Sequence, residues 1–412
     1  MRHVLHGEMK DVVELADTTM VRRASAGDAT ARRARRTIAS SGQLLPLDAV
    51  DTRQWRALAD RAIEPNGYYL PDWELAVNAS APGRTGASAL AVQSDMALIG
   101  LMPVVSLAHA YKIPLPALVS AHPYGTLCTP LLDRAYAEDA AARLMQAARD
   151  SGARALVLRD VALDGAAMKA VNAVLRGDGI RPRVLSWHLR ACLNATRGAD
   201  ELLQDALSAK KLKELRRQRH RLADEHGEVG FEVARTPSDI AAATETFLML
   251  EASGWKGRRG TALAMVEGDA AFIRRAVASL GGRGQCKIVT LRAGDTPVAS
   301  GIVLLHQSRA FFFKLGVDER FARYSPGVQL TLELTRHLCA DPKIASADST
   351  ASPDHPMINP IWRGRFAIGD VLIPLRPRDP VVAAIHAALI MRRSALDWAR
   401  SGLHLLRARR NR

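Results

Sequence analysis

The sequence predicts an α+β protein of two similar units in tandem, each with a mixed, mostly antiparallel sheet flanked by helices. Three observations support this prediction. Short apolar segments typical of strands alternate with segments typical of helices along most of the chain. Three of the strand-like segments follow one another as a meander within residues 287–317. A glycine-containing strand pattern also occurs twice, at residues 97–107 and 298–305, and its glycines are 201 residues apart.

Length and composition restrict the class of protein. The chain has 412 residues, 48% hydrophobic and 24% charged, which suggests two or three globular domains and excludes a disordered, collagen-like or histone-like chain. Its four cysteines form no CxxC pair and no Cys/His cluster with zinc spacing, so we expect buried, reduced thiols and no metal. They are Cys128, Cys192, Cys286 and Cys339.

The net charge of +15 comes from three segments. Residues 19–40 contribute +5, residues 208–226 contribute +4 and residues 390–412 contribute +6, so the rest of the chain is neutral. This distribution differs from that of a uniformly cationic nucleic-acid binder, and the sequence lacks the motifs of the common DNA-binding folds. We therefore expect no binding to duplex DNA.

Four segments are predicted along the chain. They are a flexible basic leader (1–44), a first unit (45–194), a second unit (195–378) and a basic amphipathic C-terminal helix (379–412). The first unit should contain strands at 89–92 and 97–107, a helix at 136–149, a strand at 155–158, a helix at 165–175 and a strand at 183–193.

The second unit should begin with a basic helix at 199–224 and a strand at 229–233. Thr236, Pro237 and Asp239 have the spacing of a capping box with proline in the first turn, so they predict the start of the next helix, which ends at Gly254. The remaining elements are a helix at 270–280, strands at 287–292, 298–306 and 310–317, a helix at 326–339, and strands at 343–348 and 370–375.

Three blocks of the second unit resemble one family. They are Glu-Ala-Ser-Gly-Trp-Lys-Gly at 251–257, Asp-Glu-Arg-Phe-Ala-Arg-Tyr-Ser-Pro-Gly at 318–327, and a third block at 348–365 that contains His355, Trp362 and Arg365. These blocks and the order of elements resemble the GNAT acyltransferases, in particular the CelD/BioF-like branch of bacterial acetyltransferases. The tandem arrangement also resembles the FemAB peptidyltransferases. The resemblance implies transfer of an acyl group from acyl-CoA, such as acetyl-CoA, to an amine or a hydroxyl.

A helix N-terminus at residue 326 is the candidate site for the pyrophosphate of the donor. Ser325 could cap this helix, Gly327 would let a ligand approach the backbone, and Arg323 would add a cation for phosphate. The spacing departs from the usual GNAT loop by one extra residue before Gly327, and Gln329 replaces a small residue. An acyl-protein or an aminoacyl-tRNA is therefore an alternative donor to acyl-CoA. A further alternative is that this segment is an ordinary capped helix that binds no ligand.

Direct transfer requires a base, for which Asp348, His355 and Glu251 are the candidates. No Cys or Ser lies in a nucleophile motif, so we expect no covalent acyl-enzyme. Substrate-binding candidates are Trp255, Lys256, Trp362 and Arg365. The alternatives are structural roles: a helix end for Trp255 and Lys256, a turn for Asp348, and packing for Trp362 and Arg365.

The resulting functional hypothesis is an acyltransferase acting on a small-molecule or glycan acceptor in cell-envelope or polysaccharide metabolism. The alternatives are an aminoacyl-tRNA-dependent transferase and a non-catalytic scaffold for a polysaccharide synthase. The basic helix could attract an acyl-carrier protein or tRNA. The C-terminal helix could lie on an anionic membrane or pack on the body. The early acids and the absence of a long apolar run predict a cytoplasmic protein, at most peripheral to the membrane.

Overall fold

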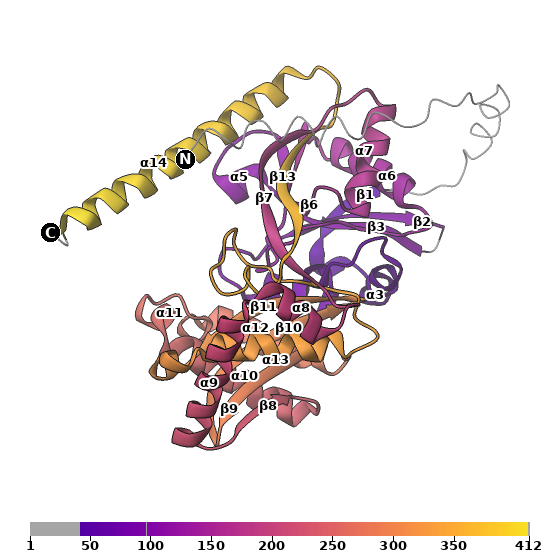
Figure 1. Cartoon of the computed structure of the whole chain (residues 1–412). Coiled ribbons are helices and arrows are strands. Elements are labelled where there is room, and N and C mark those ends of the chain that lie inside the picture. Colours follow the sequence, from indigo (N-terminus) through magenta and orange to yellow (C-terminus); the bar gives the residue numbers. More distant parts are fainter. Residues whose placement is uncertain (1–41, 96, 411–412) are drawn as a thin grey trace. The chain divides into compact units, whose positions relative to one another are not determined.

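The fold is built around one long sheet. The computed structural model describes residues 42–95 and 97–410, with side chains as far as residue 398. Thirteen described strands form the sheet in the order β1-β2-β3-β4-β6-β13-β7-β12-β11-β10-β9-β8, with β5 paired to β3. Helices flank it, and the pairing is mostly antiparallel, as predicted (Figure 1).

The elements as far as residue 194 agree with the predicted strands and helices and add several short ones. They are β1 (Gly42–Pro46), α3 (Thr52–Arg61), α4 (Pro71–Ser80), β2 (Ser88–Ser94), β3 (Ala97–Ser106), α5 (Leu107–Tyr111), β4 (Ala117–Ser120), β5 (Leu131–Leu132), α6 (Ala137–Asp150), β6 (Ala155–Ala162), α7 (Ala166–Gly177) and β7 (Arg183–Asn194). Strand β1 begins inside the segment assigned to the leader, whose residues 1–41 lie outside the described chain.

The remaining elements contain the predicted meander as β9, β10 and β11. They are α8 (Ala199–Ala206), α9 (Ala209–His226), β8 (Val229–Val233), α10 (Pro237–Ser253), α11 (Trp255–Arg258), α12 (Glu267–Gly281), β9 (Cys286–Ala293), β10 (Thr296–His306), β11 (Arg309–Val317), η4 (Glu319–Tyr324), α13 (Pro326–Cys339), β12 (Ser346–Asp348), β13 (Gly364–Pro374) and α14 (Pro380–Arg410).

Local sequence signals account for several boundaries. The capping box at Thr236 and Asp239 forms as predicted and starts α10. The single basic helix expected at 199–224 is wrong, because the chain is extended at Leu207 and the Ser208 hydroxyl accepts a hydrogen bond from the amide of Lys211. That cap starts α9 as a separate helix. Strand β12 is shorter than expected, and β13 begins six residues earlier than the predicted strand.

Strand β13 joins the two halves of the sequence. Although it comes near the end of the chain, it lies between β6 and β7 and pairs antiparallel with both. Strand β7 then pairs with β12, so the sheet continues without a break from the first half of the chain into the second. Two described pairs are parallel, β4 with β6 and β11 with β12.

An aromatic cluster fixes the first half of the chain against β11. Tyr68 contacts Phe311 edge to face, and Trp73 packs against both Phe313 and Phe272 with ring centroids 4.8 and 5.0 Å apart. Aromatics are only 5% of the chain, so their concentration here is informative. Edge-to-face pairs add to the apolar area that these large side chains bury. The cluster positions the back of β11, whose free edge forms the site described below.

The burial of the cysteines differs in part from the expectation that all four are buried. All four cysteines are free, but only Cys128 and Cys286 are buried, because Cys192 and Cys339 lie in partly exposed positions.

Helix α14 packs on the sheet through its first three turns, where Val382, Ile385 and Leu389 are buried. Farther along, Met391 and Trp398 are 65% and 80% exposed. None of the helices in the described ranges has both the length and the apolar content needed to cross a membrane.

Candidate functional site

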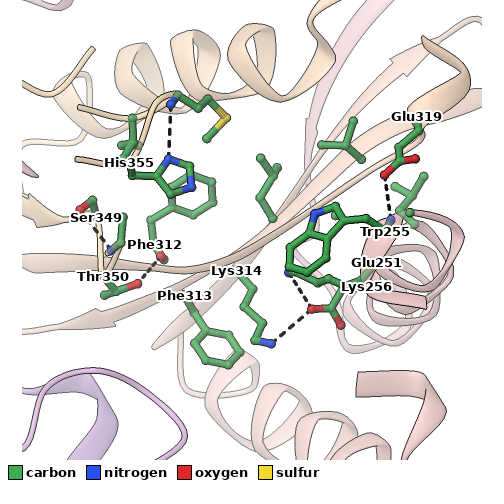
Figure 2. Close-up of a pocket in the computed structure, with 18 residues that line it drawn as sticks. Glu251, Trp255, Lys256, Phe312, Phe313, Lys314, Glu319, Ser349, Thr350 and His355 are labelled. Carbon is green, nitrogen blue, oxygen red and sulfur yellow. Dashed lines mark hydrogen bonds and ion pairs between the residues drawn. The ribbon is translucent and has the colours of Figure 1, made fainter. Parts of the chain in front are cut away.

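A cavity of about 330 Å³ opens where β11 and β12 diverge. The two strands pair in parallel only from Arg309 to Phe311 on β11. Beyond this point β11 continues to Val317 paired with β10 on its other side, and the segment after β12 turns at Thr350. At this edge of β11 the Phe312 carbonyl accepts a hydrogen bond from the Thr350 hydroxyl at 2.6 Å. Figure 2 shows the cavity between β11, the end of α10 with the start of α11, and the segment after β12.

A β-bulge on β11 shapes the wall of the cavity. On β10, Ile302 pairs with Lys314 and Val303 pairs with Phe312, so Phe313 is an extra residue on β11. A bulge interrupts the alternation of side chains between the two faces of a strand. Here Phe313 joins the aromatic cluster, while the Lys314 side chain reaches toward α10 (Figure 2).

Two lysines share one buried carboxylate in the cavity. The Oε1 atom of Glu251 accepts hydrogen bonds from Lys256 Nζ at 2.9 Å and from Lys314 Nζ at 3.2 Å (Figure 2). Its Oε2 atom accepts a hydrogen bond from the backbone N–H of Leu263 at 2.9 Å. The Glu251 side chain is fully buried, whereas the two lysine side chains are 24% and 21% exposed. Two ammonium groups on one carboxylate give this three-residue cluster a net positive charge. The cavity lining also contains Glu319, whose carboxylate pairs with Arg258.

The charges in this cluster shift one another's pKa. Burial alone would raise the pKa of Glu251, but Lys314, Lys256 and the Leu263 amide outweigh burial and hold it below its ordinary value. Burial lowers the pKa of Lys314, and Glu251 opposes that shift. Glu251 is therefore ionised at neutral pH. As a predicted base it is poorly suited, because its accepting oxygens are already occupied.

His355 lines the same cavity from the segment after β12. Its Nδ1 atom accepts a hydrogen bond from the amide of Met357 at 3.3 Å. Burial lowers its pKa, so the ring is neutral at pH 7. Because the backbone N–H of Met357 can only donate, Nδ1 of His355 carries no proton, and the neutral ring carries its proton on Nε2. In this geometry His355 offers the cavity a hydrogen-bond donor.

Asp348 is at the end of β12, where the sequence placed it, but it lies beneath the cavity and not among its lining residues. The side chain is 1% exposed and pairs with the equally buried Arg190 at 3.3 Å. Its Oδ1 atom accepts the amide of Thr350 at 2.7 Å and so fixes the turn that bounds the cavity. Through Arg190, Asp348 is also connected to Asp160 on β6.

The candidate pyrophosphate loop precedes α13. Arg323 donates to Glu225 at the end of α9. The expected cap by Ser325 is wrong, because this residue has a left-handed backbone (φ 53°) and its side chain accepts no capping hydrogen bond within the described chain. Gly327 is buried, and a Cβ there would lie 3.0 Å from Leu315 and 3.3 Å from Met357, both of which line the cavity. The first turn of α13 thus packs directly behind the cavity wall.

The remaining predicted binding residues occupy different places. Trp255 lines the cavity and is 51% exposed, with the guanidinium of Arg259 over its ring. Trp362 is fully buried in the core, where its Nε1–H donates to Thr335. Arg365 is exposed and donates to the carbonyls of residues 359, 362 and 364, so it secures its own loop.

Four of the candidate residues from the sequence, Glu251, Trp255, Lys256 and His355, line this one cavity, together with Lys314, which sequence reasoning missed. The signal was a single lysine in the otherwise apolar strand Phe-Phe-Phe-Lys-Leu-Gly-Val at 311–317. A buried strand carries such a residue only where the charge finds a partner. Within the described ranges, the chain contains no group of three or more His, Cys, Asp or Glu side chains suited to a metal ion.

Residues 209–354 match the acetyltransferase (GNAT) domain family. No curated protein sequence matches the chain. Two solved structures have a similar fold. FemX is 12% identical, with a TM-score of 0.54 over 82% of this chain and 98% of that one. The C-terminal domain of a putative lysylphosphatidylglycerol synthetase from Agrobacterium fabrum is 13% identical, with a TM-score of 0.50 over 82% of this chain and 95% of that one. Residues 209–354 are thus similar to a GNAT domain, and the fold of the longer chain is similar to those of these two structures.

Proposed function

We propose that this chain, whose residues 209–354 are similar to a GNAT domain, transfers an acyl group directly from a carrier to an amine or hydroxyl in the cavity between β11 and the segment after β12. The observation that carries the proposal is the pair of ammonium groups of Lys256 and Lys314 on the buried Glu251 carboxylate. The net positive charge of this cluster in a partly enclosed cavity favours chemistry in which negative charge develops on oxygen.

An amine acceptor must lose a proton before it attacks. Neighbouring cations lower the pKa of an amine, because they disfavour a further positive charge. Lys256 and Lys314 would therefore favour the neutral form of a bound amine, with its proton released to water. This route assigns the predicted bases other tasks: Glu251 holds the two lysines, and Asp348 holds the Thr350 turn through its buried contacts.

Attack by the amine nitrogen on the carbonyl carbon forms a C–N bond and places a negative charge on the carbonyl oxygen. Lys314 is the candidate cation for that oxyanion, and the Nε2–H of His355 is a candidate donor to the same oxygen or to the leaving group. Collapse of the intermediate breaks the bond from carbon to the leaving sulfur or oxygen. The leaving group takes up one proton, and the amide nitrogen gives one up.

Acyl-CoA is the first candidate donor. It is supported by the match to the acetyltransferase domain and by the position of α13, whose first turn lies behind the cavity wall at Gly327. The amides of a first helical turn lack partners within their own helix and suit phosphate groups. A donor of this kind would have to displace Glu225 from Arg323, because these two side chains form an ion pair.

Aminoacyl-tRNA is the second candidate donor. The fold shared with FemX and with the C-terminal domain of the putative lysylphosphatidylglycerol synthetase supports it. The basic helix α9 would give a polyanionic carrier, tRNA or an acyl-carrier protein, a surface beside the domain. The acceptor is proposed to be a small molecule or glycan of the cell envelope or of polysaccharide metabolism.

The test is a transfer assay with both donor classes. Purified protein is incubated with acetyl-CoA, longer acyl-CoAs or aminoacyl-tRNA and a panel of amino sugars and amino acids, and carrier release and product mass are measured. Lys314→Met should reduce turnover by at least about 100-fold, as expected for loss of one oxyanion donor. Lys343→Met removes an exposed lysine outside the cavity and should leave turnover unchanged.

The outcomes separate the candidates. Release of CoA supports the first donor, and deacylation of tRNA that depends on an acceptor supports the second. If no donor is consumed and folded Lys314→Met protein supports the same function in cells as the wild type, the enzyme hypothesis is wrong and the non-catalytic scaffold is favoured.

A further inference from the structure

A second cavity lies in the first half of the chain, at the other parallel strand pair. Strands β4 and β6 pair in parallel from Ala117 to Val119 and then diverge, as β11 and β12 do. A cavity of about 210 Å³ opens at this point. Its polar lining consists of Arg84, His109, His122 and Arg159, and the lining residues in the described chain include no acid.

The two arginines are held in place with donors to spare. Arg159 on β6 donates from Nε and Nη2 to the carbonyl of Ser120 at 3.1 and 2.7 Å, and its own amide donates to the Ser120 hydroxyl. Arg84 donates from Nη1 to the carbonyl of Pro82, and its buried Nε finds no hydrogen-bond partner among the described residues. A guanidinium has five N–H donors, so each arginine has capacity for a ligand.

Among the described residues, neither Arg84 nor Arg159 forms an ion pair with a carboxylate, although Asp160 follows Arg159 on β6 and their charges interact. Glu74 is fully buried, and burial raises its pKa well above the ordinary value despite the influence of Arg159. Burial therefore disfavours the charged form of Glu74. His122 is neutral at pH 7, because burial and then the charges of Arg159 and Arg84 lower its pKa to about 4. Its Nδ1 atom is also unpartnered within the described chain.

We propose that this cavity is a second ligand site, which binds a phosphate or diphosphate group. Two guanidinium groups form short, charge-assisted and often bidentate hydrogen bonds with phosphate oxygens. The neutral ring of His122 can add one more donor. A diphosphate supplies negative charge to two arginines that form no ion pair with an acid among the described residues. The group could belong to a nucleotide, to CoA or to free phosphate, and these sources share the same recognition chemistry.

Tyr124 connects this site with the acyl-transfer cavity. The guanidinium carbon of Arg84 lies 4.1 Å from the centroid of its ring, and Lys314 Nζ lies 5.5 Å from the same centroid. The Tyr124 hydroxyl donates to Asp269 at 2.6 Å, and two residues later the Thr126 hydroxyl donates to the carbonyl of Thr350 at the edge of the first cavity. A ligand held by Arg84 would thus lie beside the reaction site, although binding itself does not depend on the proposed function.

The experiment measures binding and not turnover. Pyrophosphate, CoA and uridine diphosphate are each titrated into the full chain by calorimetry at two salt concentrations. We expect pyrophosphate to bind, and Arg84→Gln and Arg159→Met each to weaken binding by at least about tenfold, as for the loss of charge-assisted hydrogen bonds. Arg84→Gln should fold normally because Arg84 is partly exposed. Arg176→Gln, at an exposed arginine on α7, is the matched control and should bind like the wild type.

The three ligands identify the source of the phosphate. A nucleotide or CoA that binds more tightly than pyrophosphate, and that loses the same factor in Arg84→Gln, contains the natural group. Equal binding of all three assigns the site to the phosphate group alone. The proposal is overturned if none of them binds, or if binding survives both arginine substitutions and is lost in Lys314→Met. That last result would place the anion in the first cavity.

Discussion

Lys314 Nζ lies 3.2 Å from the same Glu251 oxygen that Lys256 contacts at 2.9 Å. One lysine comes from β11 and the other from α11, so the carboxylate on α10 draws three elements together. Because Glu251 is fully buried and the lysines are not, the carboxylate depends on both cations for compensation of its charge. The same contacts aim the two ammonium groups into the cavity. The packing of these three elements and the proposed chemistry therefore both depend on the Glu251 side chain.

Replacing Glu251 with Gln should destabilise the fold and impair transfer together. An amide cannot compensate two ammonium groups, which then repel each other. Breaking a buried ion pair usually costs about 3–5 kcal/mol of unfolding free energy. We expect a loss near the lower end of this range, because the two lysines are partly exposed. Urea unfolding measures this loss.

The matched control is Glu245→Gln. Glu245 lies on α10, as Glu251 does, and forms an exposed ion pair with Arg274 on α12. This substitution should cost no more than about 1 kcal/mol. Equal losses for the two substitutions would contradict the role given to Glu251.

Gly316→Ala should disturb the site through backbone packing. A Cβ at this position would lie 2.8 Å from the Glu251 amide nitrogen and 3.2 Å from the Phe247 carbonyl, so α10 would have to move away from β11. Overpacking of this kind costs about 1–3 kcal/mol, and the shift would lengthen the contact between Glu251 and Lys314. We expect lower stability in urea and lower turnover.

Gly230→Ala on β8 tests whether glycine loss alone explains that result. A Cβ there meets no atom within 4 Å among the described residues, so this variant should be near wild type in both measurements. If Gly316→Ala behaved in the same way, close packing of α10 on β11 would not be what holds the site together.

The sequence predicted best those elements that carry their own local signals. Helix α10 begins at a capping box, and α13 begins at Pro326, where the sequence placed it. The meander β9–β10–β11 follows from short apolar segments separated by turns. In the candidate site, Glu251, Trp255 and Lys256 lie together because they are close in sequence.

The features that the sequence could not predict arise where strands that are far apart in the sequence pair with each other. Arg190 and Asp348 are 158 residues apart and meet only because β7 pairs with β12, so no local pattern reveals that Asp348 is buried and paired. The insertion of β13 between β6 and β7 is of the same kind. Lys314 points to the cavity beside a bulge, which shifts strand register by one residue and is invisible to a period-two pattern.

Asp160 should make stability depend on pH. Burial, then the nearby Asp370, raises its pKa from 3.8 to about 6, although Arg190 and Arg159 oppose the shift. The folded state therefore binds this proton more tightly than the unfolded state. The resulting stabilisation is complete below pH 3.8 and is lost as the pH rises through about 6.

Asp160→Asn cannot ionise and should be more stable than wild type at pH 8, by about 2 kcal/mol, with a smaller difference at pH 4.5. Asn also tolerates the left-handed backbone found there, with φ at 45°. Urea unfolding at both pH values is the measurement. Asp164→Asn, at an exposed aspartate nearby, is the matched control. A wild type that is more stable than Asp160→Asn at pH 8 would contradict the predicted sign.

Helix α14 should bind anionic membranes if its exposed face is an interfacial surface. Met391 and Trp398, two turns apart, are 65% and 80% exposed, and residues 390–412 carry a net charge of +6. Apolar insertion and attraction to anionic lipid then act together. The protein should float with phosphatidylglycerol vesicles at low salt and much less with phosphatidylcholine vesicles, and Trp398→Glu should abolish flotation. Trp187→Glu changes another exposed tryptophan, on β7, and should float normally; equal flotation of both variants would show that α14 is not the contact.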